Sequence, residues 1–272
     1  MRWACAARMR SRANAHGKGC AAVRCYTADL HIHTALSACA DDDMTPPAIV
    51  AAALKQGLDM IAICDHNSAG NAAAVQTAAG DALSVIAGIE ITTAEEAHIL
   101  GLFPDVASAE AAGGQVRETL PSVRDAAKMY GRQIVMDAEG RMLDMDGRML
   151  FMASGFPLSD AIALIRRNRG LAVASHVDRP SHSVISQLGL FPADAGFDAI
   201  EISAAGMSNG RETEFASLGL PMVSSSDSHF LGDIGSCRTV FALHKATFDE
   251  LMQAFRGEGG RRIAGREGGA CV

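Results

Sequence analysis

From residue 28 onward, short apolar runs alternate with helix-like segments along the chain. The first four apolar runs predict strands at residues 27–33, 58–67, 82–91 and 97–103. A helix is predicted over 44–57, where Thr45 suits the N-cap, Pro46 the first turn and Gly57 the stop. A second helix is predicted over 68–80. The alternation is typical of an α/β domain with mostly parallel strands.

The alternation breaks at residues 105–160 and then resumes. Within the break, residues 131–152 predict a β-hairpin that turns at Asp146-Gly147. Beyond it, the pattern predicts helices at 158–170, 183–189, 209–218 and 246–257, and strands at 171–176, 198–203 and 220–229. No internal repeat is present.

These patterns divide the chain into four parts. Residues 1–28 predict a basic, disordered extension, and residues 29–256 a single domain. Residues 105–160 are interpreted as a hairpin-containing insertion that could form a lid. The Gly-rich residues 257–272 predict a flexible tail.

The stretch "DLHIHT" at residues 29–34 places two histidines in a strand-like run. Because side chains alternate across a strand, His31 and His33 should point to one side, and Leu30 and Ile32 to the other. Two imidazoles on a buried face are costly unless their nitrogens are satisfied, and a metal ion would satisfy them.

Further polar side chains stand at or just beyond the ends of the predicted strands. They are His31, His33, Asp65, His66, Glu90, His176, Glu201, Asp227 and His229. In a βα barrel the carboxyl ends of the strands converge on one face, where the site is built. A single histidine such as His98 could be a structural residue bonded to backbone carbonyls. The repetition on strand after strand favours a shared metal site of imidazoles and carboxylates, which suits Zn, Mn or Fe.

Charge and composition limit the classes of partner that the sequence predicts. The net charge is -7, although residues 1–28 carry six basic residues and no acidic one. The remaining, more acidic body argues against long nucleic acid as a ligand. One Trp, two Tyr and ten Phe argue against stacking platforms for single strands. No run of 18 apolar residues predicts a membrane helix.

The seven cysteines form no CxxC pair, so we expect reduced thiols in a cytoplasmic protein, with Cys39 and Cys64 as packing residues. No GxSxG motif is present, and no Gly-rich phosphate loop follows the first strand. The sequence therefore argues against a serine hydrolase of that type, an NTPase or a dinucleotide enzyme.

The chain resembles the PHP (polymerase and histidinol phosphatase) family of metal-dependent phosphoesterases. The matching stretches are "DLHIHT", "GLDMIAICDHNS", "AGIEITTAEEAHILGLF", "VASHVD" and "SSSDSHF", in the order of the family. The resemblance implies a distorted seven-stranded βα barrel, of the TIM type, with two or three divalent metals (Mn, Zn or Fe) at the carboxyl ends of the strands. It also implies that 29–256 is the catalytic domain.

The resemblance further implies a ligand set. The first metal would be held by His31, His33, Glu90 and Asp227. Glu90 would bridge to a second metal, which His98 and His176 would also bind. His66, His229 and an acidic residue after "HTALSACA" would bind a third; Asp41 is favoured over Asp42 and Asp43. Glu90, Asp227 and His229 would be the catalytic residues.

Cationic side chains near the motifs are candidates for binding a substrate phosphate. Arg179 follows His176 by three residues, and Arg238 is a second candidate; either could equally be a surface charge. His182 could protonate a leaving group or cap a helix. Asp65 could orient a ligand histidine, and Glu201 could do the same, face the substrate or point to water.

The leading prediction is a metal-dependent phosphoesterase for a small phosphorylated molecule, such as a phosphate monoester, a nucleotide or a short oligonucleotide. The alternatives are a nuclease on longer nucleic acid, a non-catalytic metal-binding regulatory or accessory module, and a C–N hydrolase with a similar metal barrel. An insertion over the barrel mouth would favour a small substrate, and one facing away a partner surface. The pattern predicts no oligomeric state.

Overall fold

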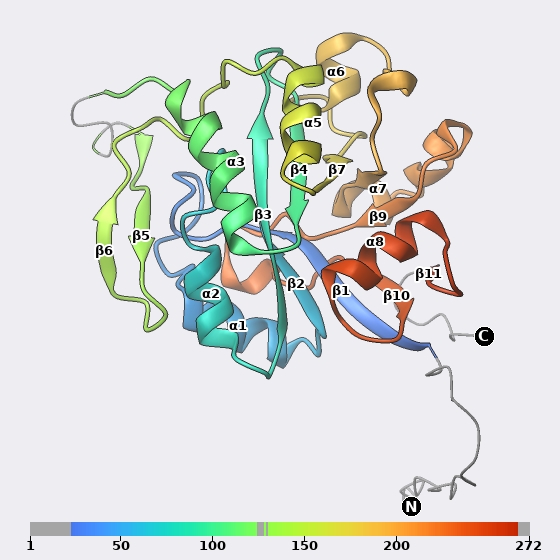
Figure 1. The fold of residues 1–272 in the computed structure, drawn as a ribbon, viewed down its shortest axis with the longest axis horizontal. Coiled ribbons are helices and arrows are strands. Elements are labelled where there is room, and N and C mark those ends of the chain that lie inside the picture. The colour runs from blue at the N-terminus through green and yellow to red at the C-terminus, as the bar shows by residue number, and fades with distance from the viewer. Residues whose placement is uncertain (1–22, 124–127, 129, 266–272) are drawn as a thin grey trace, which may run out of the picture.

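The computed structural model describes residues 23–123, 128 and 130–265, and its main feature is a nearly closed, barrel-shaped sheet (Figure 1). The described residues contribute nine strands to it, in the spatial order β11 (Arg262–Gly265), β10 (Thr239–Leu243), β1 (Arg24–Ile32), β2 (Met60–Ile63), β3 (Ser84–Thr92), β4 (His98–Phe103), β7 (Leu171–Ala174), β8 (Ala199–Ile202) and β9 (Met222–Ser224). The predicted TIM-like α/β barrel is confirmed, with nine strands in place of the seven expected.

Helices pack against the sheet (Figure 1). They are α1 (Pro46–Lys55), α2 (Ala72–Ala79), α3 (Val106–Glu118), α5 (Leu158–Arg167), α6 (Val184–Leu188), α7 (Ala204–Ser208) and α8 (Phe248–Arg256), with 3-10 turns at Ala193–Ala195, Arg211–Leu218 and Leu231–Asp233. Thr45 and Gly57 flank α1 as predicted. In the described part of the chain, every helix is too short or too polar to cross a membrane.

The strand directions decide which ends meet at the site. β1, β2 and β3 run parallel, as do β7, β8 and β9, whereas β4 is antiparallel to both β3 and β7. The start of β4 therefore lies beside the end of β3. The segment after β9 returns to β1, where the His33 N–H donates to the Ser228 carbonyl at 3.0 Å. This contact nearly closes the barrel.

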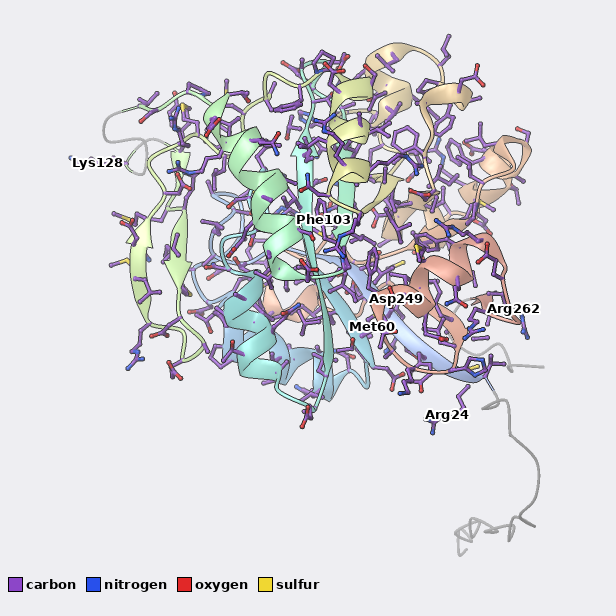
Figure 2. All side chains as sticks on the ribbon, in the orientation of Figure 1. Arg24, Met60, Phe103, Lys128, Asp249 and Arg262 are labelled. Atoms are coloured by element: carbon purple, nitrogen blue, oxygen red, sulfur yellow. The ribbon has the colours of Figure 1, made fainter. Side chains whose placement is uncertain are left out.

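Two apolar clusters lie on the two faces of the sheet. One fills the space between the strands and helices α1, α2, α3 and α5, and includes Phe103. The other consists of alternate residues of the same strands, such as Met60 and Leu100, with Leu251 of α8. Figure 2 labels Met60 and Phe103 within this double core. Glu90 follows the alternation of the second cluster, which identifies that cluster as the barrel interior.

A β-bulge in β1 changes the predicted alternation. The pairing of β1 with β2 shifts register between Asp29 and Ile32. Leu30 consequently packs inside the barrel and Ile32 outside it, so the prediction that they share a side was wrong. The extra residue of a bulge redirects side chains. His31 and His33 do share a side, with ring centroids 5.1 Å apart.

Three boundaries that the sequence predicted differ in the structure. β1 begins at Arg24 and pairs with β10, so residues 24–28 belong to the sheet and not to an extension. β11 lies in the predicted tail and pairs with β10, a strand that the pattern did not predict. α3 packs against β3 and β4, so residues 106–118 are part of the barrel wall and not of an insertion. Residues 1–22 and 266–272 lie outside the described residues.

The predicted hairpin is present as β5 (Ile134–Met136) and β6 (Met142–Met145), but its turn is not at Asp146-Gly147. The chain reverses between Asp137 and Arg141, where the Asp137 N–H donates to the Arg141 carbonyl at 3.0 Å. Gly140 takes a positive φ of 79° in this turn, a conformation that glycine adopts at no steric cost.

An ion pair ties α8 to β11 and predicts acid-dependent stability. Arg261 donates to both carboxylate oxygens of Glu250 at 2.7 and 3.0 Å, and lowers the pKa of Glu250 from 4.5 to about 2. A depressed folded-state pKa adds stability above the unfolded value of 4.5, and this is lost as the pH falls toward 2. We expect Arg261→Ala to lower the free energy of unfolding by ~0.5–1 kcal/mol at pH 7 and by less at pH 3.

Urea unfolding at the two pH values measures this difference, with Arg256→Ala, an exposed arginine at the end of α8, as the control. An equal loss at both pH values would contradict the ion-pair explanation.

Candidate metal centre

The ends of β1 and β3 and the loop after β9 bring four predicted ligands together. The ligand atoms of His31, His33, Glu90 and Asp227 all lie within 4.8 Å of one another. Asp227 Oδ1 lies 3.3 Å from His31 Nε2 and 3.1 Å from His33 Nε2. The two Nε2 atoms are 3.2 Å apart. All four residues predicted to hold the first metal therefore converge.

Neighbouring acceptors determine which nitrogen of each ring carries the proton. His31 Nδ1 lies 3.0 Å from Glu201 Oε2, and because a carboxylate only accepts, Nδ1 must donate. His33 Nδ1 lies 2.9 Å from Ser37 Oγ, whose hydroxyl donates to Asp65 at 2.7 Å. The two Nε2 atoms then face each other, and each can offer its lone pair to a cation or carry a second proton. This arrangement fits a cation between them.

Glu201 and Asp65 therefore orient histidines that are predicted ligands. Glu201 is 1% exposed and its Oε2 also accepts the His176 N–H at 3.1 Å, so it does not point to water. Asp65 acts through Ser37, a residue that the sequence reasoning missed. Ser37 stands only four residues after His33 in the sequence, and this short spacing was the available signal.

Glu90 lies at the centre of the site and is 1% exposed. One carboxylate oxygen, Oε1, lies 2.9 Å from His98 Nδ1 and 3.2 Å from His176 Nε2. The other, Oε2, lies 3.0 Å from His66 Nδ1 and within 3.5 Å of both histidines of β1. A carboxylate whose two oxygens face different groups of imidazoles is suited to bridge two cations.

A third cluster consists of His33, His66 and His229, whose ligand nitrogens lie within 4.8 Å of one another. The Asp41 N–H donates to the His229 carbonyl at 2.9 Å, so its backbone lies beside this cluster. The Asp41 carboxylate is exposed and accepts the Asp43 N–H at 2.9 Å.

The two other candidate carboxylates do not face the third cluster either. The Asp42 carboxylate is exposed and pairs with Arg132, and Asp43 is exposed. Among the described residues, none of the potential metal-binding groups includes a carboxylate from this loop. Asp41 therefore stays a prediction as a ligand.

The charges of the centre stabilise one another in the metal-free protein. Burial acts to raise the pKa of Glu90, but the His98, His31 and His66 rings outweigh it and hold the pKa well below its usual range. Burial would lower the pKa of His31, but Asp227 and the two glutamates raise it well above 6.5. Protons on the histidines thus compensate the carboxylates, and a bound cation would replace those protons.

The histidines differ in how they titrate. Burial lowers the pKa of His98 and of His229 to about 4 each, because the carboxylates only partly offset it. The pKa of His33 and of His66 is raised to about 9, since carboxylate neighbours outweigh burial there. His98 and His229 are therefore neutral at pH 7 and offer free lone pairs.

Two of the predicted ligands have a left-handed backbone. His176 has a φ of 28° and Asp227 a φ of 52°, a region that non-glycine residues rarely adopt. Such strain persists only where the surroundings hold it, and it concentrates at functional sites. The position of both residues just after a strand agrees with the predicted site.

His98 stands at the start of its strand, as the sequence predicted. It is the first residue of β4, and because β4 runs antiparallel it pairs with Thr92 at the end of β3. The antiparallel direction of β4 therefore brings the start of this strand to the centre.

Two of the three candidate substrate-binding residues lie at the centre. Arg179 Nη1 is 2.6 Å from Asp227 Oδ2, and the arginine side chain is 40% exposed. The His182 ring stacks on His98 with centroids 4.7 Å apart, and its Nδ1 lies 3.2 Å from the Glu96 carbonyl.

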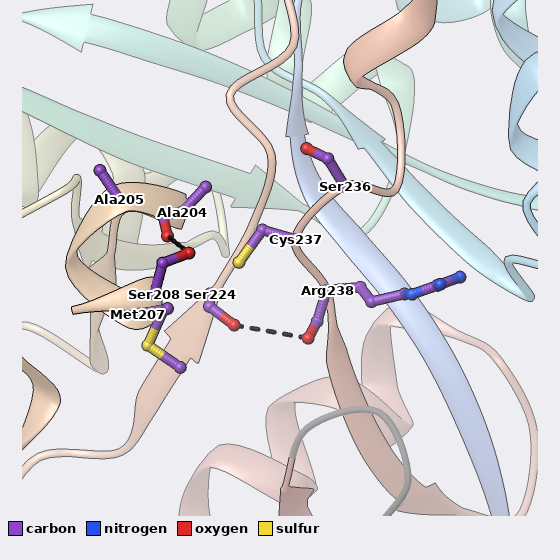
Figure 3. A pocket seen from close by; sticks show the side chains of 8 residues that line it. All are labelled: Ala204, Ala205, Met207, Ser208, Ser224, Ser236, Cys237 and Arg238. Atoms are coloured by element: carbon purple, nitrogen blue, oxygen red, sulfur yellow. Dashed lines mark hydrogen bonds between the residues drawn. The ribbon is translucent and has the colours of Figure 1, made fainter. Parts of the chain in front are cut away.

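Arg238 does not belong to the centre. Its guanidinium donates to the Gln56 carbonyl at 2.7 Å, at the end of α1 that leads into the start of β2. A separate cavity of about 480 Å³ is lined by Met207, Cys237, Arg238 and neighbouring small residues and by no predicted metal ligand; Figure 3 shows the guanidinium end of Arg238 extending away from Met207 and Cys237. The sequence could not indicate this direction, because it depends on how β10 pairs with β1.

The cysteine predictions have mixed outcomes. Cys64 is buried in the barrel interior, as expected of a packing residue, whereas Cys39 is exposed. Cys39, Cys64 and Cys237 are free thiols, but Cys25 is disulfide-bonded, so the expectation that all are reduced was wrong.

The hairpin region borders the loops that carry the ligands. The Ile134 N–H donates to the Ala35 carbonyl at 2.8 Å, and the Asn71 side chain bonds to the backbone of Ile134 and Met136. Asn67, next to His66, donates to backbone carbonyls at residues 150 and 152. Residues 131–152 therefore form one wall beside the centre.

Fold and site together define a metal-binding α/β barrel with a histidine–carboxylate centre at the strand ends. Residues 29–177, more than half of the chain, match the sequence model of the family described as "PHP domain". Residues 206–258 match a model described as "PHP-associated". The chain belongs to the PHP family of metal-dependent phosphoesterases. None of the curated proteins compared with it is similar enough to count as a match.

Solved structures share the fold at low identity. The lesion-specific endonuclease Q from Pyrococcus furiosus has a TM-score of 0.61 and 18% identity over 89% of this chain. This chain spans only 58% of that enzyme. An amidohydrolase from Chromobacterium violaceum, solved with sulfate, has a TM-score of 0.57 and 20% identity, with coverage of 84% of this chain and 96% of that one.

A protein from Bifidobacterium adolescentis, provisionally described as a metal-dependent phosphoesterase, has a TM-score of 0.56 and 19% identity. The similarity covers 83% of this chain and 94% of that one. At these identities the likenesses support the fold and leave the substrate open.

Proposed function

We propose that the protein is a metal-dependent phosphoesterase that hydrolyses a small phosphorylated molecule. The observation that carries the proposal is the position of Glu90, whose two oxygens face five imidazoles from four different segments. Bound divalent ions would activate water and neutralise the charge on phosphate oxygens. Two to three ions, of Mn, Zn or Fe, are consistent with three overlapping clusters. These are His31, His33, Glu90 and Asp227; His33, His66 and His229; and His66, Glu90 and His98.

The proposed ligands are those that the resemblance implied. His31, His33, Glu90 and Asp227 would hold the first ion, Glu90 with His98 and His176 the second, and His66 with His229 the third, to which Asp41 would have to turn its side chain. Glu90, Asp227 and His229 are proposed as the catalytic residues, because a reacting phosphate would lie among them.

The chain's own residues would bind and position the substrate. Arg179 pairs with Asp227 here, and its half-exposed guanidinium is placed to bind phosphate oxygens instead. His182 stands beside His98 and is proposed to contact the leaving group. Arg238 is not part of the proposal.

Two observations support a small substrate. A cavity of about 350 Å³, lined by residues that include Asp178, Ser203 and Arg211, borders Arg179 and is large enough for part of a small metabolite. The acidic balance of the chain does not favour long nucleic acid. A cytoplasmic location stays a prediction from the sequence.

The test is metal content followed by turnover. We expect two to three metal ions per chain by mass spectrometry, and release of phosphate from an aryl phosphate monoester or a nucleotide panel. A chelator should abolish the release, and Mn, Zn or Fe should restore it. Cleavage of oligonucleotides alone would favour a nuclease, and metal binding without any cleavage a non-catalytic module. A protein that binds no metal would refute the proposal.

A further inference from the structure

We infer that Asp29 is a positioning residue that clamps both ends of the segment carrying Asp227 and His229, and thereby sets the metal affinity of the centre. This inference rests on the proposed function, because Asp227 and His229 are taken as ligands. Asp29 belongs to the same motif as the two β1 histidines but has no place in any of the three ligand clusters.

The clamp is formed by one buried carboxylate. Asp29 is 0% exposed. Its Oδ1 accepts the Ser226 N–H at 3.0 Å, and its Oδ2 accepts the Ser226 hydroxyl at 2.5 Å and the Gly235 N–H at 2.9 Å. Ser226 comes directly before Asp227, and Gly235 lies six residues after His229, so both ends of the loop are bound to the same side chain.

The backbone of the loop between Ser226 and Gly235 is strained at Asp227, the proposed metal ligand. Asp227 has a φ of 52°, which L-residues other than glycine rarely adopt. Ser228 is held to β1 on both sides: its N–H donates to the His31 carbonyl at 3.3 Å, and its carbonyl accepts the His33 N–H. With Ser226 fixed to Asp29, Asp227 is confined between two anchored neighbours, and its carboxylate faces both imidazoles of β1.

The choice of an aspartate at this position agrees with a clamp. The Asp29 carboxylate is fully buried, and a buried carboxylate is costly to keep inside the protein unless hydrogen-bond donors satisfy it. An asparagine would be less costly but has only one acceptor oxygen, whereas three donors converge here. Both oxygens are needed to hold both ends of the loop.

The experiment compares metal affinity in Asp29→Asn, Ser226→Ala and a control. In Asp29→Asn an NH₂ group faces either the Gly235 N–H or the Ser226 N–H, so one end of the loop loses its acceptor. We expect the Zn²⁺ dissociation constant, measured by competition with a chromogenic chelator, to rise ~10–100-fold. This is the usual effect of removing a residue that holds a metal ligand in place. Ser226→Ala removes one bond and should raise the dissociation constant by less.

Asp59→Asn is the matched control, because Asp59 also accepts a backbone N–H of β1, that of Thr27 at 2.8 Å, but at the end of the strand away from the site. It should bind Zn²⁺ as the wild type does. Aryl phosphate hydrolysis by Asp29→Asn should be reduced at limiting metal and recover at saturating metal.

The outcomes separate this inference from the proposed function. A wild type that binds no Zn²⁺ refutes the proposed function. A wild type that binds while Asp29→Asn binds equally well refutes the clamp alone. If circular dichroism shows that Asp29→Asn is unfolded, Ser226→Ala decides: a raised dissociation constant supports the clamp, and an unchanged one overturns it.

Discussion

Replacing Glu90 with glutamine will remove at least one metal ion per chain and lower phosphate release by more than ~100-fold. The amide keeps the shape of the side chain but loses the negative charge and one acceptor oxygen. Because Oε1 and Oε2 face different histidines, the two cations of a bridged pair could not both keep an oxygen ligand from this side chain. Loss of a residue that hydrogen-bonds a metal ligand typically lowers metal affinity or activity by ~10–100-fold. Loss of a ligand that bridges two ions should lower them by more.

Mass spectrometry of the metal content and the rate of hydrolysis check this expectation. Glu110→Gln is the matched control, since Glu110 is exposed on α3 and makes the same chemical change away from the centre. Full metal content and wild-type turnover in Glu90→Gln would show that Glu90 does not bridge. Loss of turnover with full metal content would instead assign Glu90 a role in the reaction itself.

Adding a single methyl group at Gly88 will destabilise the barrel by about 2–3 kcal/mol. Gly88 lies in β3, and a Cβ there would stand 2.6 Å from Cys64 Sγ, 3.0 Å from the Ile63 carbonyl oxygen and 3.2 Å from the Gly101 carbonyl oxygen. Two of these three atoms belong to the backbones of the flanking strands, which cannot move without disturbing the sheet.

Urea unfolding of the chelator-treated protein measures the effect of Gly88→Ala without the contribution of bound metal. In Gly114→Ala, the matched control on α3, the new Cβ meets nothing within 4 Å. We expect this variant to gain ~0.5–1 kcal/mol, because alanine favours the helix. Equal stability of Gly88→Ala and the wild type would contradict the close packing of β2, β3 and β4.

The Gly88 substitution should also affect the site. Gly88 lies two residues before Glu90 on the same face of β3, so a shift of the strand displaces the central carboxylate. Weaker metal binding is therefore expected in the folded fraction of Gly88→Ala and not in Gly114→Ala.

Local sequence patterns determined much of this protein. The ends of α1 were predictable because Thr45, Pro46 and Gly57 act through local backbone preferences, although the Thr45 side chain makes no capping hydrogen bond. The strand-end positions of His31, Glu90 and Asp227 were also predictable, because apolar runs end where the polar ligands begin. The α/β class followed from the alternation of strands and helices, and the barrel from the resemblance to the family.

Long-range pairing decided the rest. The bulge that places Leu30 and Ile32 on opposite faces arises from a register shift in the pairing of β1 with β2. The local alternation of apolar and polar residues does not reveal it. Likewise, His98 joins the centre because β4 runs against β3, which depends on the partner strand. Arg238 faces α1 instead of the centre for a similar reason.

The sequence by itself determined which residues could be ligands and roughly where along the chain they would stand. Only the tertiary structure decided that Glu90 lies at the centre, that Ser37 and Glu201 orient the β1 histidines, and that the Asp41 carboxylate points outward. The physical reason is that residue type and spacing govern local conformation, whereas the direction of a side chain at a strand end is set by hydrogen bonds to segments far away in the sequence.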